Sequence, residues 1–216
     1  MPQLFSTRAT TLVRVCLTLA VVGAGGAAAL ALAWARAPST WNVGVPASQP
    51  IPFRHDLHSG RIGIDCRYCH ASVETAAYAG MPTTGTCLTC HAQVWSGASV
   101  LEPLRTSAGE DRAIRWTSVS RLPDWSYFHH AVHVKAGAAC QTCHGRVDQM
   151  PEIVRAETLS MGFCLDCHRD PVPRLRPAST VSASGTGPHE RGLPEELRVF
   201  YREASRRLTE CSSCHR

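Results

Sequence analysis

Ten of the 11 cysteines stand in five Cys-x-x-Cys pairs, and each pair is followed at once by histidine. The two thiols of such a pair lie on one face of a helical turn, so both can reach the vinyl groups of one haem. The adjacent imidazole is then the proximal iron ligand, and the whole pattern is the attachment signature of c-type haem. The chain therefore predicts five c-type haems, numbered here motifs 1 to 5 in chain order: Cys66/Cys69/His70, Cys87/Cys90/His91, Cys140/Cys143/His144, Cys164/Cys167/His168 and Cys211/Cys214/His215.

Zinc is the main alternative for these cysteines, because two Cys-x-x-Cys pairs can build a Cys₄ site. Five pairs cannot form whole Cys₄ sites, and zinc gives no reason for a histidine after every pair. A disulfide scaffold is also excluded, since cysteines two residues apart cross-link distant segments poorly. The eleventh cysteine, Cys16, is expected to be an apolar side chain of the amino-terminal hydrophobic segment.

Six histidines lie outside the motifs, and four of them form two pairs at i, i+3 spacing: His55 with His58, and His130 with His133. Each pair presents two imidazoles on one face of a turn. Two ligands on one turn cannot both bind the same face of one iron, so each pair is predicted to supply distal ligands to two neighbouring haems. His129 could replace His130, but the alignment of the two copies described below favours His130.

Four distal histidines leave one of five irons without a matching ligand. Methionine is the other common axial ligand of c-type haem, and it raises the reduction potential. Met150 and Met161 both precede motif 4, Met161 by three residues, and they are the preferred candidates for this ligand. Met81 is instead expected to pack against a haem. His189 lies in a polar stretch and is expected to be a solvated surface residue.

The region 53–170 contains an internal repeat of two-haem units, spanning 53–91 and 128–168. Each copy begins Phe-x-His-x-x-His, continues to a haem motif followed by Val and an acidic residue, and then reaches a second motif. Seven residues separate the second histidine from the motif in the first copy and six in the second. The sequence therefore predicts a duplicated dihaem unit with a fifth haem appended.

The first 36 residues are predicted to be a membrane anchor. Arg8 and Arg14 precede an uncharged run of 21 residues, 15–35, and that length suffices to cross a bilayer as a helix. The alternative is a cleaved signal, with Ala33-Trp34-Ala35 as the cleavage site, although signal cores are usually shorter. The arginines place the start of the helix in the cytoplasm. The chain is therefore expected to cross the cytoplasmic membrane once, with the haem region facing the periplasm.

The remaining segments complete the organisation. Residues 37–52 and 171–190 are rich in Pro and small polar residues and are predicted to be linkers, the second one flexible. Residues 191–216 are predicted to form a helix that ends in motif 5. With only 14 aromatic residues, the fold class expected is mainly α with much irregular loop, wrapped around haems that take the place of a conventional core.

The formal net charge of +5 does not indicate a nucleic-acid partner, because ten haem propionates would more than offset it. Basic residues within the haem region are instead expected to pair with propionates or to be solvated: Arg61, Arg67, Arg146 and Arg155.

The segments G-I-D-C-R-Y-C-H, F-H-H-A-V-H-V, C-Q-T-C-H-G-R-V-D-Q-M and L-S-M-G-F-C-L-D-C-H-R, with a closing C-S-S-C-H-R, resemble the pentahaem cytochrome subunit of bacterial alternative complex III. The resemblance covers residues 53–170 and the carboxy-terminal motif. The H-x-x-H-plus-motif unit is also similar to small multihaem cytochromes of the class III type. The resemblance implies an uncleaved anchor, distal ligands at His55, His58, His130 and His133, and Met-bearing segments at Met150 and Met161.

The resemblance also implies partners. These are an iron–sulfur/molybdopterin-like subunit, integral membrane subunits that bind quinol, and a monohaem cytochrome c. The chain would carry electrons from quinol oxidation in a respiratory or photosynthetic complex to a cytochrome c, a copper protein or a terminal oxidase, and would not itself be an enzyme.

Two other function classes are weighed against this one. A stand-alone quinol dehydrogenase would need a quinol pocket, for which one anchor helix offers little material. A multihaem nitrite reductase would need an open iron and typically a lysine as proximal ligand, whereas all five motifs here end in histidine.

Overall fold

The structure is a computed structural model and describes residues 6–183 and 193–215. It divides into two compact units, Met1–Asn42 and Val43–Arg216, which are described separately.

The first unit consists of helix α1 (Thr7–Arg36) and the helical turn η1 (Pro38–Trp41). Ser6 caps α1 by accepting a hydrogen bond from the Ala9 amide at 3.3 Å, which satisfies one of the free donors of the first turn. None of its described side chains is buried, that of Cys16 included. Thirty residues span about 45 Å, so α1 is long and apolar enough to cross a membrane.

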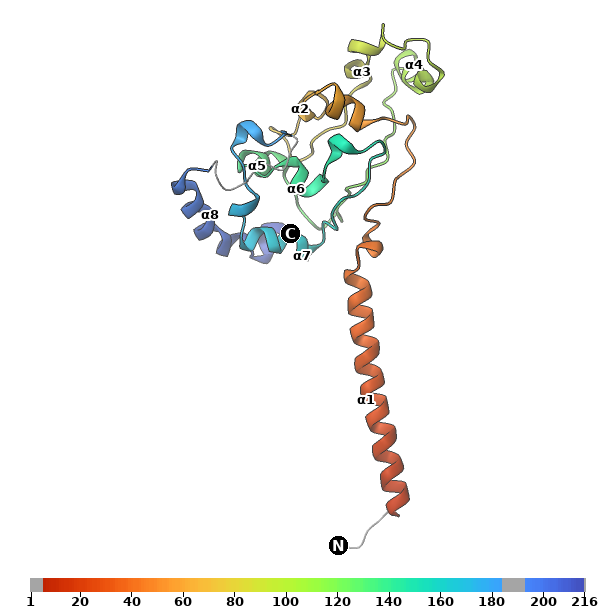
Figure 1. The fold of residues 1–216 in the computed structure, drawn as a ribbon, viewed down its shortest axis with the longest axis vertical. Coiled ribbons are helices and arrows are strands. Elements are labelled where there is room, and N and C mark those ends of the chain that lie inside the picture. The colour runs from red at the N-terminus through yellow and green to blue at the C-terminus, as the bar shows by residue number, and fades with distance from the viewer. Residues whose placement is uncertain (1–5, 184–192, 216) are drawn as a thin grey trace. The chain divides into compact units, whose positions relative to one another are not determined.

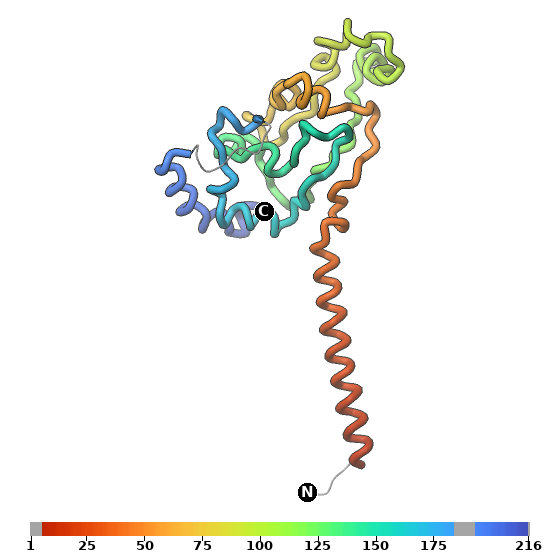
Figure 2. The backbone as a smooth tube through the Cα atoms, viewed as in Figure 1, coloured from red at the N-terminus to blue at the C-terminus, as the bar shows by residue number. Residues whose placement is uncertain are grey.

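The second unit is built from short helices joined by irregular loops (Figures 1 and 2). Its described residues contain isolated β-bridges and no strand, as the sequence predicts. The α-helices are α2 (Cys66–Cys69), α3 (Thr84–His91), α4 (Glu102–Gly109), α5 (His130–Lys135), α6 (Cys140–His144), α7 (Met161–Arg169), α8 (Glu195–Leu208) and α9 (Cys211–Cys214). The remaining helical turns are η2 (Asp56–Arg61), η3 (Ser99–Leu101), η4 (Val147–Gln149), η5 (Val172–Arg174) and η6 (Ala178–Thr180), of which η2 is π-helical.

Two small apolar clusters are found among the buried residues of the described chain. One joins Ile51 to Leu101 and Leu104 of η3 and α4. The other joins the buried side chains of Val73, Val134 and Val181. Clusters of this size cannot stabilise a domain of this length alone, which agrees with an interior occupied by bound groups.

Described residues of both predicted linkers contact distant segments of the second unit. In the first, the Gly44 amide donates to the Arg155 carbonyl at 2.8 Å, and the Gln49 side chain bonds the backbone of Thr117. In the second, Val172 and Val181 are buried, so residues 171–183 are packed rather than flexible. The polar composition of both stretches gave no signal for these contacts. The rest of the second linker, including His189, lies outside the described residues.

Helix α8 agrees with the predicted carboxy-terminal helix. Pro194 precedes it, Glu195 and Glu196 occupy its first turn, and Arg206 and Arg207 occupy its last. Acidic residues near the amino end and basic residues near the carboxyl end complement the helix dipole. The helix leads directly into α9, which carries motif 5.

Candidate haem sites

Each of the five motifs lies on a short helix, and the structure explains why these helices form. Asp65 caps α2, since its carboxylate accepts from the Arg67 amide at 2.8 Å. Ser160 caps α7 in the same way by accepting from the Phe163 amide at 3.3 Å. A helical turn places both cysteines of a motif on one face, with the histidine immediately after them. This is the arrangement that two thioether bonds and a proximal ligand require.

The ten motif cysteines are free of disulfides but differ in exposure. Cys90 of motif 2 and Cys211 of motif 5 are exposed, whereas the other eight, Cys167 among them, are half-buried. The Cys90 sulfur lies 3.9 Å from the Thr89 hydroxyl near the end of α3. The sequence does not predict this difference, because all five motifs have the same spacing. A porphyrin attached at motif 2 would cover the exposed Cys90 sulfur.

Cysteines of neighbouring motifs lie close enough to affect one another. Burial, with smaller contributions from the charges of Cys167 and Cys164, raises the pKa of the Cys143 thiol to about 12. Burial also raises the pKa of Cys69, and the charge of Cys87 adds to that shift. Motif 4 therefore adjoins motif 3 through Cys167, and motif 2 adjoins motif 1 through Cys87.

Three motif histidines face an imidazole from one of the H-x-x-H turns. Two imidazoles on opposite sides of one metal have ring centres about 6.3 Å apart, because each metal–nitrogen bond is about 2 Å and the ring centre lies about 1.1 Å further. The ring centres in the structure are separated by 6.1 Å in His58–His91, 6.4 Å in His130–His144 and 6.0 Å in His133–His168. The spacing fits one iron between the members of each pair.

His55 has the remaining motif histidine of its repeat, His70, as a neighbour. Burial, with smaller contributions from the nearby charges of His70 and His58, lowers the pKa of His55 to about 4. Its Nδ1 is buried and has no hydrogen-bond partner among the described residues. The two H-x-x-H turns together therefore bring four imidazoles to the histidines of motifs 1 to 4.

Most of these imidazoles direct Nδ1 to a backbone carbonyl, which leaves Nε2 available for a metal. Such a bond fixes both the tautomer and the ring orientation of a metal-binding histidine. The acceptors are Gly80 for His70 (2.7 Å), Val94 for His91 (2.9 Å), Leu208 for His168 (2.9 Å), Trp125 for His215 (3.1 Å), Arg54 for His58 (2.8 Å), Ala77 for His130 (2.8 Å) and His129 for His133 (2.9 Å).

Burial keeps several of these imidazoles neutral. It lowers the pKa of His144 to about 4, with smaller contributions from the charges of His130 and His70. Burial is also the main cause that lowers the pKa of His133. The neutral imidazole is the form that binds a metal, so the protonation state suits iron ligation.

The two H-x-x-H turns have nearly the same internal geometry. The Phe53 ring makes an edge contact with His55 at a distance of 4.8 Å between ring centres, and it stacks on His58 at 4.3 Å. Phe128 makes the equivalent contacts at 4.7 Å with His130 and 4.3 Å with His133. The repeat in the sequence is thus a repeat in three dimensions, and the phenylalanine holds both rings of each turn.

Motif 5 is held by the residues just before Phe128. The Tyr127 amide donates to the Cys214 carbonyl at 2.8 Å, and His215 bonds the Trp125 carbonyl. Burial raises the pKa of the Cys164 thiol, as does the charge of the nearby Cys214, so motif 5 lies beside the first turn of α7.

The three candidate methionines occupy different surroundings. The Met150 methyl group would lie 3.4 Å from a Cβ at Gly145, so this side chain adjoins motif 3. Met161 is the first residue of α7 and is 66% exposed, while Met81 is 41% exposed.

Three of the four arginines predicted to pair with propionates or to be solvated make other contacts, and the fourth, Arg61, is exposed. Arg67 pairs with Asp65 and Glu74, and Arg146 pairs with Asp148 at 2.7 Å. Arg155 donates to two backbone carbonyls.

A different guanidinium, that of Arg174, suits a propionate better. Its Nη1 is buried with no hydrogen-bond partner among the described residues, and its charge acts on Cys143 of motif 3. A buried donor without a partner is costly, and an anionic group bound beside it would remove that cost. The sequence gives no signal for Arg174, because nothing distinguishes it from the solvated arginines around it.

The residues present therefore fit c-type haem, by the imidazole spacing, the ring tautomers and the helical cysteine pairs. Within residues 6–183 and 193–215, no three or more His, Cys, Asp or Glu side chains are grouped so as to hold a metal ion between them.

Comparison with known proteins agrees with this geometry. Residues 126–216, which contain motifs 3 to 5, match the family described as cytochrome c7 and related cytochrome c. The chain thus contains a multihaem cytochrome c domain.

A second match is the protein named menaquinone reductase, multihaem cytochrome c subunit, of Nitratidesulfovibrio vulgaris. It is 32% identical over 97 residues, which cover 44% of this chain and 45% of that protein. The match therefore spans slightly less than half of either chain.

Proposed function

We propose that this chain is a membrane-anchored pentahaem cytochrome c that transfers electrons as a subunit of a quinol-linked oxidoreductase complex. The observation that carries the proposal is the pairing of imidazoles at 6.0–6.4 Å. Iron held on both sides by imidazole has no free position for a substrate, and such sites suit electron transfer rather than substrate conversion.

The proposed ligand pairs follow from the contacts above. His55 and His70 would hold the iron at motif 1, with His58–His91, His130–His144 and His133–His168 at motifs 2, 3 and 4. The ten motif cysteines, from the exposed Cys90 to the half-buried Cys167, would attach the porphyrins. When bound, c-type haem supplies one-electron redox chemistry at iron. The chain sets the ligands, buries the rings and fixes their tautomers.

Met161 is the better candidate for the distal ligand of motif 5. It precedes Cys164 by three residues on α7, and Cys164 lies beside Cys214. Met150 instead adjoins motif 3, where His130 already faces His144. A methionine ligand would give motif 5 a higher potential than the four sites with paired histidines.

The link to quinol is supported in two ways. The relative of 32% identity is named as a menaquinone reductase subunit, and the haem motifs resemble those of the alternative complex III cytochrome. We propose the alternative complex III assignment and the quinol-oxidising direction on that resemblance. Its partners would be the iron–sulfur/molybdopterin-like and quinol-binding subunits. The acceptor would be a cytochrome c, a copper protein or an oxidase.

The membrane placement is proposed from α1. Arg8 and Arg14 lie at its beginning, and an excess of basic residues marks the cytoplasmic side of a membrane helix. The second unit would then face the periplasm, on the single-pass anchor predicted from the sequence.

Purification from native membranes tests the proposal. We expect mass spectrometry of the purified sample to find integral membrane and iron–sulfur subunits together with this chain. Isolation as a lone haem protein that still reacts with quinol would instead favour the stand-alone quinol dehydrogenase. A spectral shift with nitrite or carbon monoxide would point to an open iron and contradict the electron-transfer assignment.

A further inference from the structure

The two dihaem repeats bind each other through exchanged backbone contacts. The Ala131 amide, on the second H-x-x-H turn, donates to the Ala76 carbonyl behind motif 1 at 3.1 Å. The Asp56 amide, on the first turn, donates to the Met150 carbonyl behind motif 3, also at 3.1 Å. The two donors, Asp56 and Ala131, are 75 residues apart, and the two acceptors, Ala76 and Met150, are 74 residues apart. The two hydrogen bonds therefore join equivalent positions of the repeat. Each distal turn is thus held by the other repeat.

Close packing reinforces the exchange. A Cβ at Gly60 would lie 2.2 Å from the Asp148 carbonyl oxygen, so η2 and η4 approach as closely as glycine allows. On the other side, His130 directs Nδ1 to the Ala77 carbonyl at 2.8 Å. These contacts place motif 1 and motif 3 against each other.

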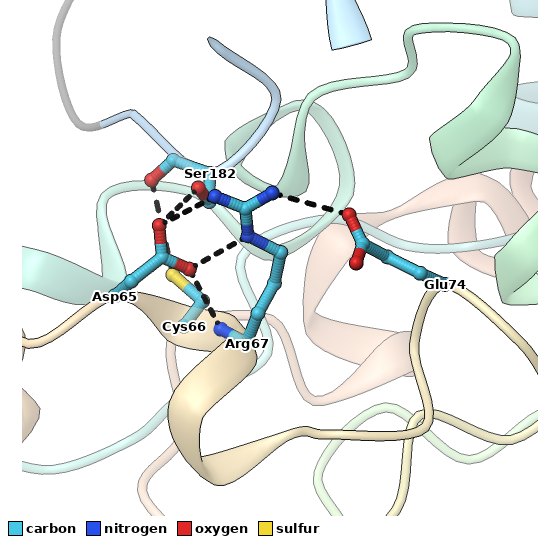
Figure 3. A network of polar contacts seen from close by, with 5 residues as sticks. All are labelled: Asp65, Cys66, Arg67, Glu74 and Ser182. Carbon is cyan, nitrogen blue, oxygen red and sulfur yellow. Dashed lines mark hydrogen bonds and ion pairs between the residues drawn. The ribbon is translucent and has the colours of Figure 1, made fainter. Parts of the chain in front are cut away.

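Residues 181–182 tie the same two motifs together, and Figure 3 shows the contacts on the motif 1 side, where Ser182 meets Asp65 and Cys66. The Cys140 amide donates to the Val181 carbonyl at 3.0 Å, which holds the start of α6. The Ser182 hydroxyl donates to Asp65 at 2.7 Å, and the Ser182 carbonyl lies 3.9 Å from the Cys66 sulfur, at the start of α2. Asp65 is fixed in turn by Arg67.

The other motifs join this pair at its two ends. Motif 2 meets motif 1 because His55 and His58 lie on one turn, and motif 4 meets motif 3 through His130 and His133. Motif 5 adjoins motif 4, since His168 bonds the Leu208 carbonyl three residues before Cys211. Figure 1 shows α3, which carries motif 2, at one end of the second unit and α7 and α8 at the other.

We propose that the motifs form one unbranched series in the order 2–1–3–4–5, that motifs 1 and 3 are the single junction between the two repeats, and that Ser182 is the positioning residue of this junction. The inference rests on the proposed function, because it requires a haem at each motif. It assigns the ends of the series to motif 2 and motif 5, which are then the sites for exchange with other redox centres.

Ser182 acts through Asp65 and not on iron. Its hydroxyl donates a charge-assisted hydrogen bond, which is stronger than a neutral one. Without it, residues 181–182 would lose this hydrogen bond to the start of α2, and the bond from the Cys140 amide to the Val181 carbonyl would open more often. The attachment chemistry at each motif would be unaffected, while the distance between motifs 1 and 3 would be less tightly fixed.

The test compares Ser182→Ala with Thr180→Ala in the full-length, haem-loaded protein in detergent. Thr180 is a matched control, because its hydroxyl donates to the Pro177 carbonyl within the same helical turn. In Ser182→Ala we expect amide exchange at Cys140 to rise about tenfold. We also expect a smaller exciton couplet in the Soret circular dichroism and slower redistribution of electrons after flash reduction. Ser182→Thr keeps the hydroxyl and should restore all three.

The outcomes separate the two proposals. Intact mass first counts the haems in the unmodified protein, and fewer than five would overturn the proposed function itself. With five haems present in both variants, an unchanged couplet and unchanged internal electron transfer in Ser182→Ala would overturn the role of Ser182. Equal changes in Thr180→Ala would overturn it as well, because the effect would then not depend on the bond to Asp65.

Discussion

The two H-x-x-H turns hold their histidines in nearly identical ring geometry but on different backbones. In the second repeat the turn is the α-helix α5, and in the first it is the π-helical turn η2. The first repeat has one more residue between its second histidine and its motif. A π-helical turn absorbs one inserted residue within a helix. The position of the imidazoles was therefore preserved while the backbone beneath them changed.

The repeats also differ in how they orient the first imidazole. His130 directs Nδ1 to the Ala77 carbonyl, whereas the Nδ1 of His55 is buried without a hydrogen-bond partner among the described residues. A ligand whose second nitrogen is bonded is better oriented and more basic. The iron at motif 1 is therefore expected to have the less constrained distal ligand.

Replacing the first histidine of either H-x-x-H turn, His55 or His130, is expected to have the largest effect on iron ligation. We expect His55→Ala and His130→Ala each to leave one five-coordinate iron, because each removes one ligand of a trans pair. Carbon monoxide should then bind to one haem per protein, measured by optical titration, and one low-spin signal should disappear from the electron paramagnetic resonance spectrum.

His129→Ala is the control, since His129 is adjacent and contributes its backbone carbonyl to His133. It should bind no carbon monoxide. Binding in His129→Ala and none in His130→Ala would show that the repeat alignment assigns the wrong histidine.

The close contact between η2 and η4 predicts the next largest effect. Gly60→Ala would bring a methyl group into the Asp148 carbonyl, and overpacking of this kind costs about 3 kcal/mol. Gly97→Ala is the control, because nothing lies within 4 Å of its added Cβ. Chemical unfolding should show a lower midpoint for Gly60→Ala only. Equal midpoints would mean that the repeats do not pack in this way.

The buried guanidinium of Arg174 predicts a change confined to the second repeat. A cation beside a redox centre stabilises the reduced, less positive form, so Arg174→Gln should lower one reduction potential by tens of millivolts. Arg169→Gln removes an exposed charge that pairs loosely with Asp166 and should leave the potentials unchanged. Potentiometric titration followed optically checks both variants. A shift in Arg169→Gln alone would contradict the role of Arg174.

The helix caps of the first motif in each repeat predict the smallest effect, and it depends on pH. Asp65 caps α2, whereas Ala139 precedes α6 and makes no side-chain cap. Hydrogen bonds from Arg67 hold the pKa of Asp65 below its usual range. Because the pKa of Asp65 is lower in the folded than in the unfolded protein, its charge stabilises the fold at pH values above the unfolded pKa of about 4. This stabilisation is lost as the pH falls below that value.

The Tm of Asp65→Asn should therefore be lower than that of the unmodified protein at pH 7, and the difference should shrink below about pH 4. Thermal unfolding at several pH values measures it. A difference that stays constant down to pH 2 would mean that the Asp65 charge does not contribute.

Much of the site could be predicted from the sequence, because haem attachment uses side chains in fixed order. The motif spacing, the Phe-x-His-x-x-His copies and the anchor helix are all local patterns. The exchanged contacts between repeats could not be predicted, since their acceptors are the backbone carbonyls of Ala76 and Met150. Any residue at those positions supplies the same carbonyl. The different exposure of Cys90 and Cys167 was equally hidden, because it depends on which segments surround α3 and α7.

Residues 171–183 show a second limit of sequence reasoning. Val172, Leu175 and Val181 are buried, but prolines and small polar residues separate them. They follow neither the helical nor the strand period that indicates a packed face. Their burial depends on where α2, α5 and α6 lie, which is determined by contacts distant in sequence.

The ligand state of the purified protein tests the central claim most directly. Intact mass spectrometry of the full-length chain would count covalent haems, and carbon monoxide titration of the reduced protein would count open irons. We predict five haems and no carbon monoxide binding, with spectra of low-spin iron throughout. Fewer than five haems, or a haem that binds carbon monoxide in the unmodified protein, would contradict a chain in which every iron is held on both sides for electron transfer.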